Sequence, residues 1–107
     1  MKMIKYLTDQ RNLQAILGNP MGTGTEAVKE NILALFSEVN EVLNELNWKP
    51  WKQDIHDVSR EDIIEELVDV FMFYCNILNE LGVSESEFDT IWNRKHNTVI
   101  RRKDNGY

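Results

Sequence analysis

Four carboxylates interrupt two otherwise apolar segments of this sequence. Glu38 and Glu41 fall in one segment, and Glu66 and Asp69 fall in the next, with the same spacing of three residues. On a helix, that spacing places both members of a pair on one face. Because carboxylates in an apolar setting repel one another and lose hydration, they are tolerated mainly when they are paired or when they bind a cation. The pattern predicts a Mg²⁺ site made by all four residues.

Magnesium at such a site would suit phosphate chemistry. The ion prefers oxygen ligands and keeps several waters, so its open positions can accept phosphate oxygens. It neutralises charge on a polyphosphate and lowers the pKa of a water, whose proton a neighbouring carboxylate can accept. A di-iron centre is disfavoured, because neither His56 nor His96 follows a glutamate by three residues. Both histidines are expected to be exposed to solvent.

The alternative for either acidic pair alone is an ordinary solvated helix face. Two pairs, both embedded in apolar helices, favour a functional site over that alternative. Glu45 lies one turn beyond Glu41 on the same face and is a further candidate for the site. Glu65 points about 100° away from Glu66, so we expect it on the surface.

The elements that must position these acids are predicted to be helices, since no segment alternates with period two over a strand length. Apolar periodicity and glycine or proline breaks predict helices over 2–17, about 26–47, 60–81 and from Ser84 onward. Thr25, Ser59 and Ser84 are the expected N-caps, and Gly82 is the expected end of the third helix. The second and third helices are apolar around most of their circumference, which favours an oligomer.

Size and charge limit the partners of the chain. Its 107 residues suit a single α-helical domain over 1–107, and its net charge of −6 disfavours binding to a nucleic-acid polymer. No run of about 18 apolar residues is present, so no membrane association is expected.

The lone Cys75 excludes an intrachain disulfide and a cysteine-cluster zinc site, and is expected to be a buried thiol. Because no leader-like segment is recognised, the expected compartment is the cytoplasm.

The order of these motifs resembles the all-α nucleoside triphosphate pyrophosphohydrolases, a superfamily that includes MazG proteins, dimeric dUTPases and dCTP pyrophosphatases. The two acidic pairs, separated by 24 residues, resemble the superfamily signature. The segment from Trp48 to Lys52 is similar to the tryptophan–lysine segment of phage-type dimeric dUTPases. The segments 12–18 and 95–107 are similar to their first helix and C-terminal motif.

This resemblance implies a four-helix-bundle-like fold of the MazG and dimeric dUTPase type, assembled as a homodimer or homotetramer. It also implies hydrolysis between the α and β phosphates, which yields a nucleoside monophosphate and pyrophosphate. Two or more Mg²⁺ ions would be held by the four acids, with Glu38 and Glu41 catalytic and Glu41 orienting the attacking water. The expected phosphate-binding residues are Lys95, Arg102 and Lys52. The expected base-binding residues are Trp48, Trp51, Gln14, Phe73 and Asn76.

The chain departs from the dimeric dUTPase pattern at a few positions that bear on the substrate. Met72 stands where a histidine is common, and His96 and Val99 stand where an asparagine pair is common. The favoured substrates are therefore dUTP or dCTP, with neither preferred over the other. Two alternatives stay open: a broad-specificity, MazG-like nucleoside triphosphate pyrophosphatase, and a non-catalytic helical dimerisation or adaptor module.

Overall fold

The fold is all-α, as the sequence predicts. The computed structural model describes residues 2–18, 24–53 and 55–106, and contains no strand within those ranges. The predicted helices lie within about two residues of the observed ones. The four helices are α1 (Met3–Ile16), α2 (Thr25–Glu45), α3 (Arg60–Glu80) and α4 (Glu85–Asp104).

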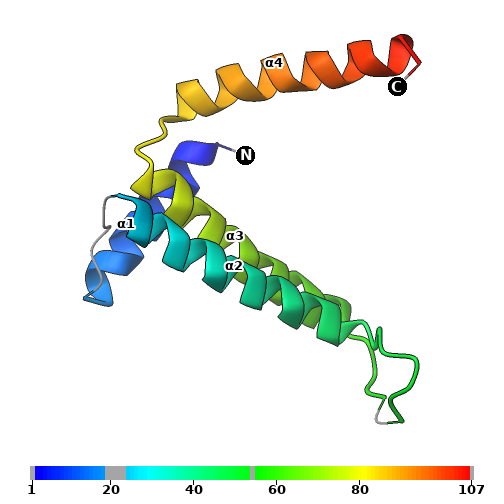
Figure 1. Cartoon of the computed structure of the whole chain (residues 1–107). Coiled ribbons are helices and arrows are strands. Elements are labelled where there is room, and N and C mark those ends of the chain that lie inside the picture. The colour runs from blue at the N-terminus through cyan, green and yellow to red at the C-terminus, as the bar shows by residue number, and fades with distance from the viewer. Residues whose placement is uncertain (1, 19–23, 54, 107) are drawn as a thin grey trace.

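The centre of the molecule is an antiparallel pair formed by α2 and α3 (Figure 1). Helix α1 packs against α3 near the end of α3 that leads to α4. The small core lies at this junction, where Leu7 of α1 is buried with Cys75 and Leu78 of α3. Tyr6 and Phe71 pack edge to face beside it, with ring centroids 5.4 Å apart. The prediction that Cys75 is a buried thiol is confirmed.

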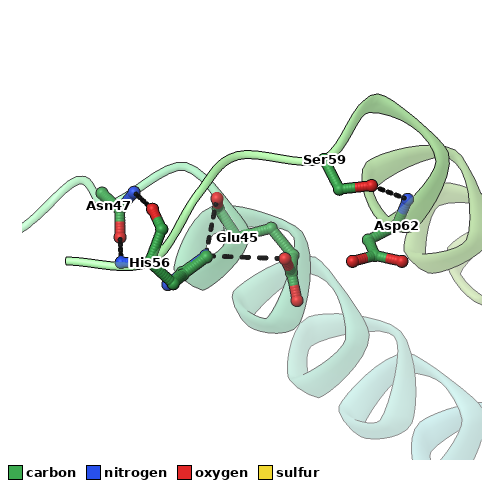
Figure 2. Close-up of polar contacts among 5 residues, drawn as sticks. All are labelled: Glu45, Asn47, His56, Ser59 and Asp62. Atoms are coloured by element: carbon green, nitrogen blue, oxygen red, sulfur yellow. Dashed lines mark hydrogen bonds and ion pairs between the residues drawn. The ribbon is translucent and has the colours of Figure 1, made fainter.

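Local hydrogen bonds explain where α3 begins and ends. The Ser59 hydroxyl accepts a hydrogen bond from the Asp62 amide at 3.3 Å, which caps the N-terminus of α3 (Figure 2). At the other end, Gly82 adopts a φ of 68°, a left-handed conformation that glycine reaches without strain. The amides of Gly82 and Val83 then donate to carbonyls of the last turn, as in a Schellman motif.

Of the other two predicted N-caps, one is confirmed. The Ser84 hydroxyl accepts from the Glu87 amide at 3.1 Å and caps α4. The prediction for Thr25 is wrong, because Thr25 is already the first residue of α2 and Gly24 occupies the capping position. Gly24 has a φ of 94° and no side chain to accept a hydrogen bond, so the start of α2 is shaped by backbone conformation instead.

Helix α4 leaves the α2–α3 pair and extends away from it (Figure 1), making an angle of 109° with α3. Apolar side chains of α2 and α3, the two helices for which the sequence predicts cover by a partner, stay exposed in a single chain, as do some of α4. Phe36 on α2 is 65% exposed, and Trp92 on α4 is 60% exposed. Within the described residues, no helix taken singly meets the length and hydropathy needed to cross a membrane, whereas α3 and α4 meet it only as a bent pair.

Candidate metal centre and adjoining pocket

Three of the four predicted metal ligands converge between α2 and α3. Glu38 of α2 and Glu66 and Asp69 of α3 each offer a carboxylate oxygen, and these oxygens all lie within 4.8 Å of one another. Glu38, Glu66 and Asp69 are all partly buried along their helices, and Asp69 is the most open of the three at the cluster. A set of oxygen donors that is closed on the helix side and open to solvent on the other fits Mg²⁺, which binds through a few carboxylates and keeps the rest of its shell for water or phosphate.

The neighbouring acids lie close enough to the Glu66 carboxyl to change its pKa. Partial desolvation raises the pKa of Glu66 above its ordinary value, and the negative charges of four neighbours raise it further. These neighbours are Asp69, Glu38, Glu41 and Glu45, in decreasing order of effect. Glu41 is exposed and stands outside the converging trio, and Glu65 is exposed as predicted. The acids on α2 and α3 therefore behave as one negatively charged cluster.

A polar pocket adjoins this cluster where the connection after α2 folds back on the helix end. Its volume is about 290 Å³. Asn44, the first residue of its wall, lies six residues after Glu38, which is about 9 Å along the helix axis. The pocket is lined by Asn44, Asn47, Trp48, Lys49, Lys52, Ile55 and His56.

The wall of the pocket is held by contacts between Asn47 and His56. Asn47 has a φ of 51°, a left-handed conformation that asparagine tolerates, and it turns the chain out of α2. Its side chain donates to the His56 carbonyl at 2.6 Å and accepts from the His56 amide at 3.3 Å (Figure 2). The His56 ring Nε2 also lies 3.1 Å from the Glu45 carbonyl oxygen and 3.6 Å from the Glu45 carboxylate.

His56 is a residue whose role was missed at the sequence level. It is exposed, as predicted, but it also anchors the connection to the end of α2 and lines the pocket. Its contact with Asn47 spans nine positions of an irregular segment. No periodic pattern in the sequence indicates such a contact, since periodicity applies only inside regular elements.

The two tryptophans of the connection differ in their relation to the pocket. Trp48 lines the pocket, and its indole nitrogen donates to the Asn44 side chain at 3.3 Å. Trp51 packs edge to face on Trp48, with centroids 5.7 Å apart, but it is 69% exposed and is not among the lining residues. The Lys49 ammonium lies 5.5 Å from the Trp48 ring centroid. The pocket thus combines an aromatic wall with the cations of Lys49 and Lys52.

The other residues predicted to bind phosphate or base lie outside this pocket. Lys95 and Arg102 are exposed on α4, which extends away from the α2–α3 pair, so one chain does not bring them to the acids. Gln14 is half-buried on α1, and Phe73 is half-buried on α3. Asn76 is only 2% exposed. These three stand apart from the pocket wall that Trp48 helps to form.

Comparison with known proteins gives the family. A family model described as dUTPase matches residues 2–107. The dCTP pyrophosphatase of Enterobacteria phage LZ5 is 37% identical over 71 residues, which cover 56% of this chain and 41% of the relative. The dCTP pyrophosphatase of Enterobacteria phage T4 is 35% identical over 71 residues, which cover 56% of this chain and 42% of the relative. The match thus spans about two-fifths of the length of these relatives, and no solved structure matches significantly. Together with its four helices, the match over residues 2–107 shows that the chain belongs to the dimeric dUTPase family.

Proposed function

We propose that this protein is a Mg²⁺-dependent pyrophosphohydrolase that cleaves the α–β phosphate bond of dUTP or dCTP. The observation that carries the proposal is the convergence of Glu38, Glu66 and Asp69 on one point between two helices. Family membership supports a deoxynucleoside triphosphate as substrate. The two phage relatives support including dCTP beside dUTP. The products would be a deoxynucleoside monophosphate and pyrophosphate.

The residues of the acidic cluster divide into two roles. Glu38, Glu66 and Asp69 would hold Mg²⁺, and Glu41 would join them where a second ion binds. Bound Mg²⁺ neutralises phosphate charge and makes water easier to deprotonate. Because Glu41 is exposed and outside the trio, its carboxylate is available to orient the attacking water and accept its proton. The water oxygen bonds to the α phosphorus while the bond to the bridging oxygen breaks and pyrophosphate leaves.

The pocket beside the cluster would receive the nucleoside. Trp48 presents an aromatic surface on which a base can stack, and Lys49 and Lys52 place positive charge on the same wall. Trp51 would support Trp48 from outside the pocket. In the connection between α2 and α3, Lys52 is still the proposed phosphate-binding residue. Base contacts by Gln14, Phe73 and Asn76 stay predictions.

A second copy of the chain would complete the enzyme as a homodimer or homotetramer. The exposed apolar side chains of α2, α3 and α4, such as Phe36 and Trp92, are the support for this assembly. A second subunit that covers them would also bring Lys95 and Arg102 of its own α4 to the phosphates. We propose a single domain over 1–107 that acts on free nucleotides in the cytoplasm, without a nucleic-acid polymer or a membrane as partner.

A substrate panel tests the proposed function. The protein is incubated with each deoxynucleoside triphosphate and ribonucleoside triphosphate, with and without Mg²⁺, and pyrophosphate release is measured. Turnover confined to dUTP, dCTP or both, and dependent on Mg²⁺, supports the proposal. Turnover of many nucleotides would favour the MazG-like alternative. A protein that neither turns over nor binds any nucleotide in Mg²⁺ would favour the adaptor alternative.

A further inference from the structure

A second polar cluster lies between α2 and α3, about two to three helical turns beyond the acids on α3. It consists of Asn31 on α2 and of Asn76 and Glu80 on α3. Asn76 is 2% exposed and Glu80 is 9% exposed, so both are almost excluded from solvent. Because a buried polar group without a hydrogen-bond partner costs free energy, the partner of each atom in this cluster matters.

The hydrogen bonds of Asn31 fix the direction of the whole cluster. Its amide nitrogen lies 3.2 Å from the Ala27 carbonyl oxygen, which can only accept, so this atom is the nitrogen and not the oxygen. The same nitrogen donates to Glu80 Oε1. The Asn31 side-chain oxygen therefore faces Asn76, whose Nδ2 donates to it at 3.2 Å. It follows that Asn76 presents its oxygen, not its nitrogen, on its remaining side.

Two buried atoms are left over. Asn76 Oδ1 and Glu80 Oε2 have no hydrogen-bond partner among the residues that the structure describes. Asn76 and Glu80 are four residues apart on α3, so their side chains share one face of the helix, and Asn31 contacts both. Two acceptors cannot satisfy each other, but a single proton on Glu80 Oε2 would turn that oxygen into a donor for Asn76 Oδ1.

We propose that Glu80 carries this proton in the folded protein and donates it in a hydrogen bond to Asn76, which closes a ring of three side chains. In the ring, Asn31 donates to Glu80, Glu80 donates to Asn76, and Asn76 donates to Asn31. Every polar atom of the three side-chain termini then has a partner. Both polar atoms of the Asn76 amide are also engaged, so Asn76 joins α2 to α3.

The charges around Glu80 support a neutral acid. Burial raises the pKa of Glu80, and the negative charge of Glu30 on α2 raises it further, while the hydrogen bond from Asn31 lowers it. On α1, the cation that reaches α3 is Arg11, and its guanidinium donates to the Asn79 side chain at 3.1 Å. Lys5 on α1 pairs with Asp9 of the same helix. The ion pairs of the described residues thus leave Glu80 without a cation.

The ring makes the α2–α3 pair sensitive to pH. A carboxyl whose pKa is raised in the folded state contributes stability below its unfolded pKa, and this contribution is lost as pH rises through the folded pKa. Above the folded pKa, Glu80 is charged, the proposed hydrogen bond to Asn76 is lost, and two buried acceptors are left without a donor. The substitution Glu80→Gln keeps the ring at every pH, because the glutamine nitrogen donates to Asn76 and its oxygen accepts from Asn31.

Thermal melting of the full chain tests this proposal. The wild type, Glu80→Gln and the control Glu65→Gln, which changes an exposed glutamate of the same helix, are melted without metal between about pH 4 and pH 9. We expect the Tm of the wild type to fall relative to Glu80→Gln as pH rises, and Glu65→Gln to follow the wild type. A Tm difference between wild type and Glu80→Gln that does not change with pH would overturn the proposal. So would a Glu80→Gln protein that is less stable than the wild type at every pH.

Infrared spectroscopy gives a second readout that does not depend on unfolding. A protonated carboxyl has a carbonyl stretch that a carboxylate lacks. We expect this band in the wild type at a pH where exposed carboxyls are ionised, and its loss or weakening in Glu80→Gln but not in Glu65→Gln. Identical bands in all three proteins would show that Glu80 is ionised and would overturn the proposal. Neither readout depends on nucleotide turnover, so failure here is distinct from failure of the proposed enzyme activity.

Discussion

Glu38 on α2 and Glu66 on α3 face each other across the antiparallel helix pair, with carboxylate oxygens no more than 4.8 Å apart. Asp69 lies within the same distance of both. Because these like charges come from different helices, their repulsion opposes the packing that brings them together. A bound cation would neutralise this repulsion, so metal binding should stabilise the folded protein.

The first prediction concerns the stability of the metal-free protein. Desolvation and neighbouring acids raise the pKa of Glu66 in the folded state, so its neutral form favours folding. The associated stability is present below the unfolded pKa and is lost as pH rises through the folded pKa. Millimolar Mg²⁺ should therefore raise the Tm, and most strongly at higher pH, where the acids are charged and protons no longer compete with the ion. Melting curves with and without Mg²⁺ across the pH range measure this.

Two variants provide controls for the Mg²⁺ effect. Glu66→Gln should reduce the increase in Tm that Mg²⁺ causes, because one ligand and one charge are removed. Glu65→Gln, which changes the adjacent exposed residue, should respond like the wild type. A Tm that does not change with Mg²⁺ at any pH would count against a metal site at these residues.

The second prediction concerns Glu41. Replacing it with glutamine should lower kcat by about 10²–10⁴-fold, the typical contribution of a group that accepts a proton in the transition state. Because Glu41 is exposed and outside the converging trio, the Tm should change little. Steady-state kinetics and melting on the same preparations check both parts. A Glu41→Gln enzyme with the wild-type rate would show that another group handles the proton.

The third prediction concerns the pocket. Trp48→Ala should raise KM with a smaller effect on kcat, because loss of a stacking surface typically weakens base binding by about 1–3 kcal/mol. Trp51→Ala should raise KM less, since Trp51 lies outside the pocket lining and contacts Trp48 at its edge. Kinetics of both variants with dUTP and dCTP make the comparison. Equal effects from the two substitutions would argue that the connection acts only as a packed unit.

The fourth prediction concerns the position of the α4 cations in the assembled enzyme. Arg102→Ala and Glu41→Gln should each be nearly inactive alone. If α4 of one protomer serves the acids of its partner, mixing the two variants should restore activity, because each mixed dimer contains one intact site. Random exchange between dimers would restore about a quarter of the wild-type rate. The measurement is pyrophosphate release after the two proteins have been incubated together.

The mixing experiment distinguishes an Arg102 that acts on the acids of the partner from one that acts on the acids of its own protomer. No recovery, in dimers shown by mass spectrometry of the intact dimers to have exchanged chains, would mean that Arg102 acts on the acids of its own protomer. In that case α4 must fold back onto the α2–α3 pair when the nucleotide binds, since one chain alone holds it away (Figure 1).

The sequence alone determined those features of the fold that depend on residues close to one another in the chain. Helix ends depend on hydrogen bonds within about five residues, so Ser59, Ser84 and Gly82 were recognisable as boundaries. The spacing of three residues likewise placed Glu38 with Glu41, and Glu66 with Asp69, on one helix face each. Residue types and periodicity therefore placed the acids of the candidate site on two helix faces, while their binding of Mg²⁺ stays a prediction.

Contacts between elements were decided only by the tertiary structure. The rotation and register of α2 against α3 depend on side chains packed along their whole length, and they bring Glu38 but not Glu41 into the converging trio. The same packing places Asn31 against Asn76 and Glu80, residues 45 and 49 positions apart, which no local pattern indicates. The fold of the connection that joins Asn47 to His56, and the departure of α4, likewise depend on interactions between segments, because no periodic repeat encodes them.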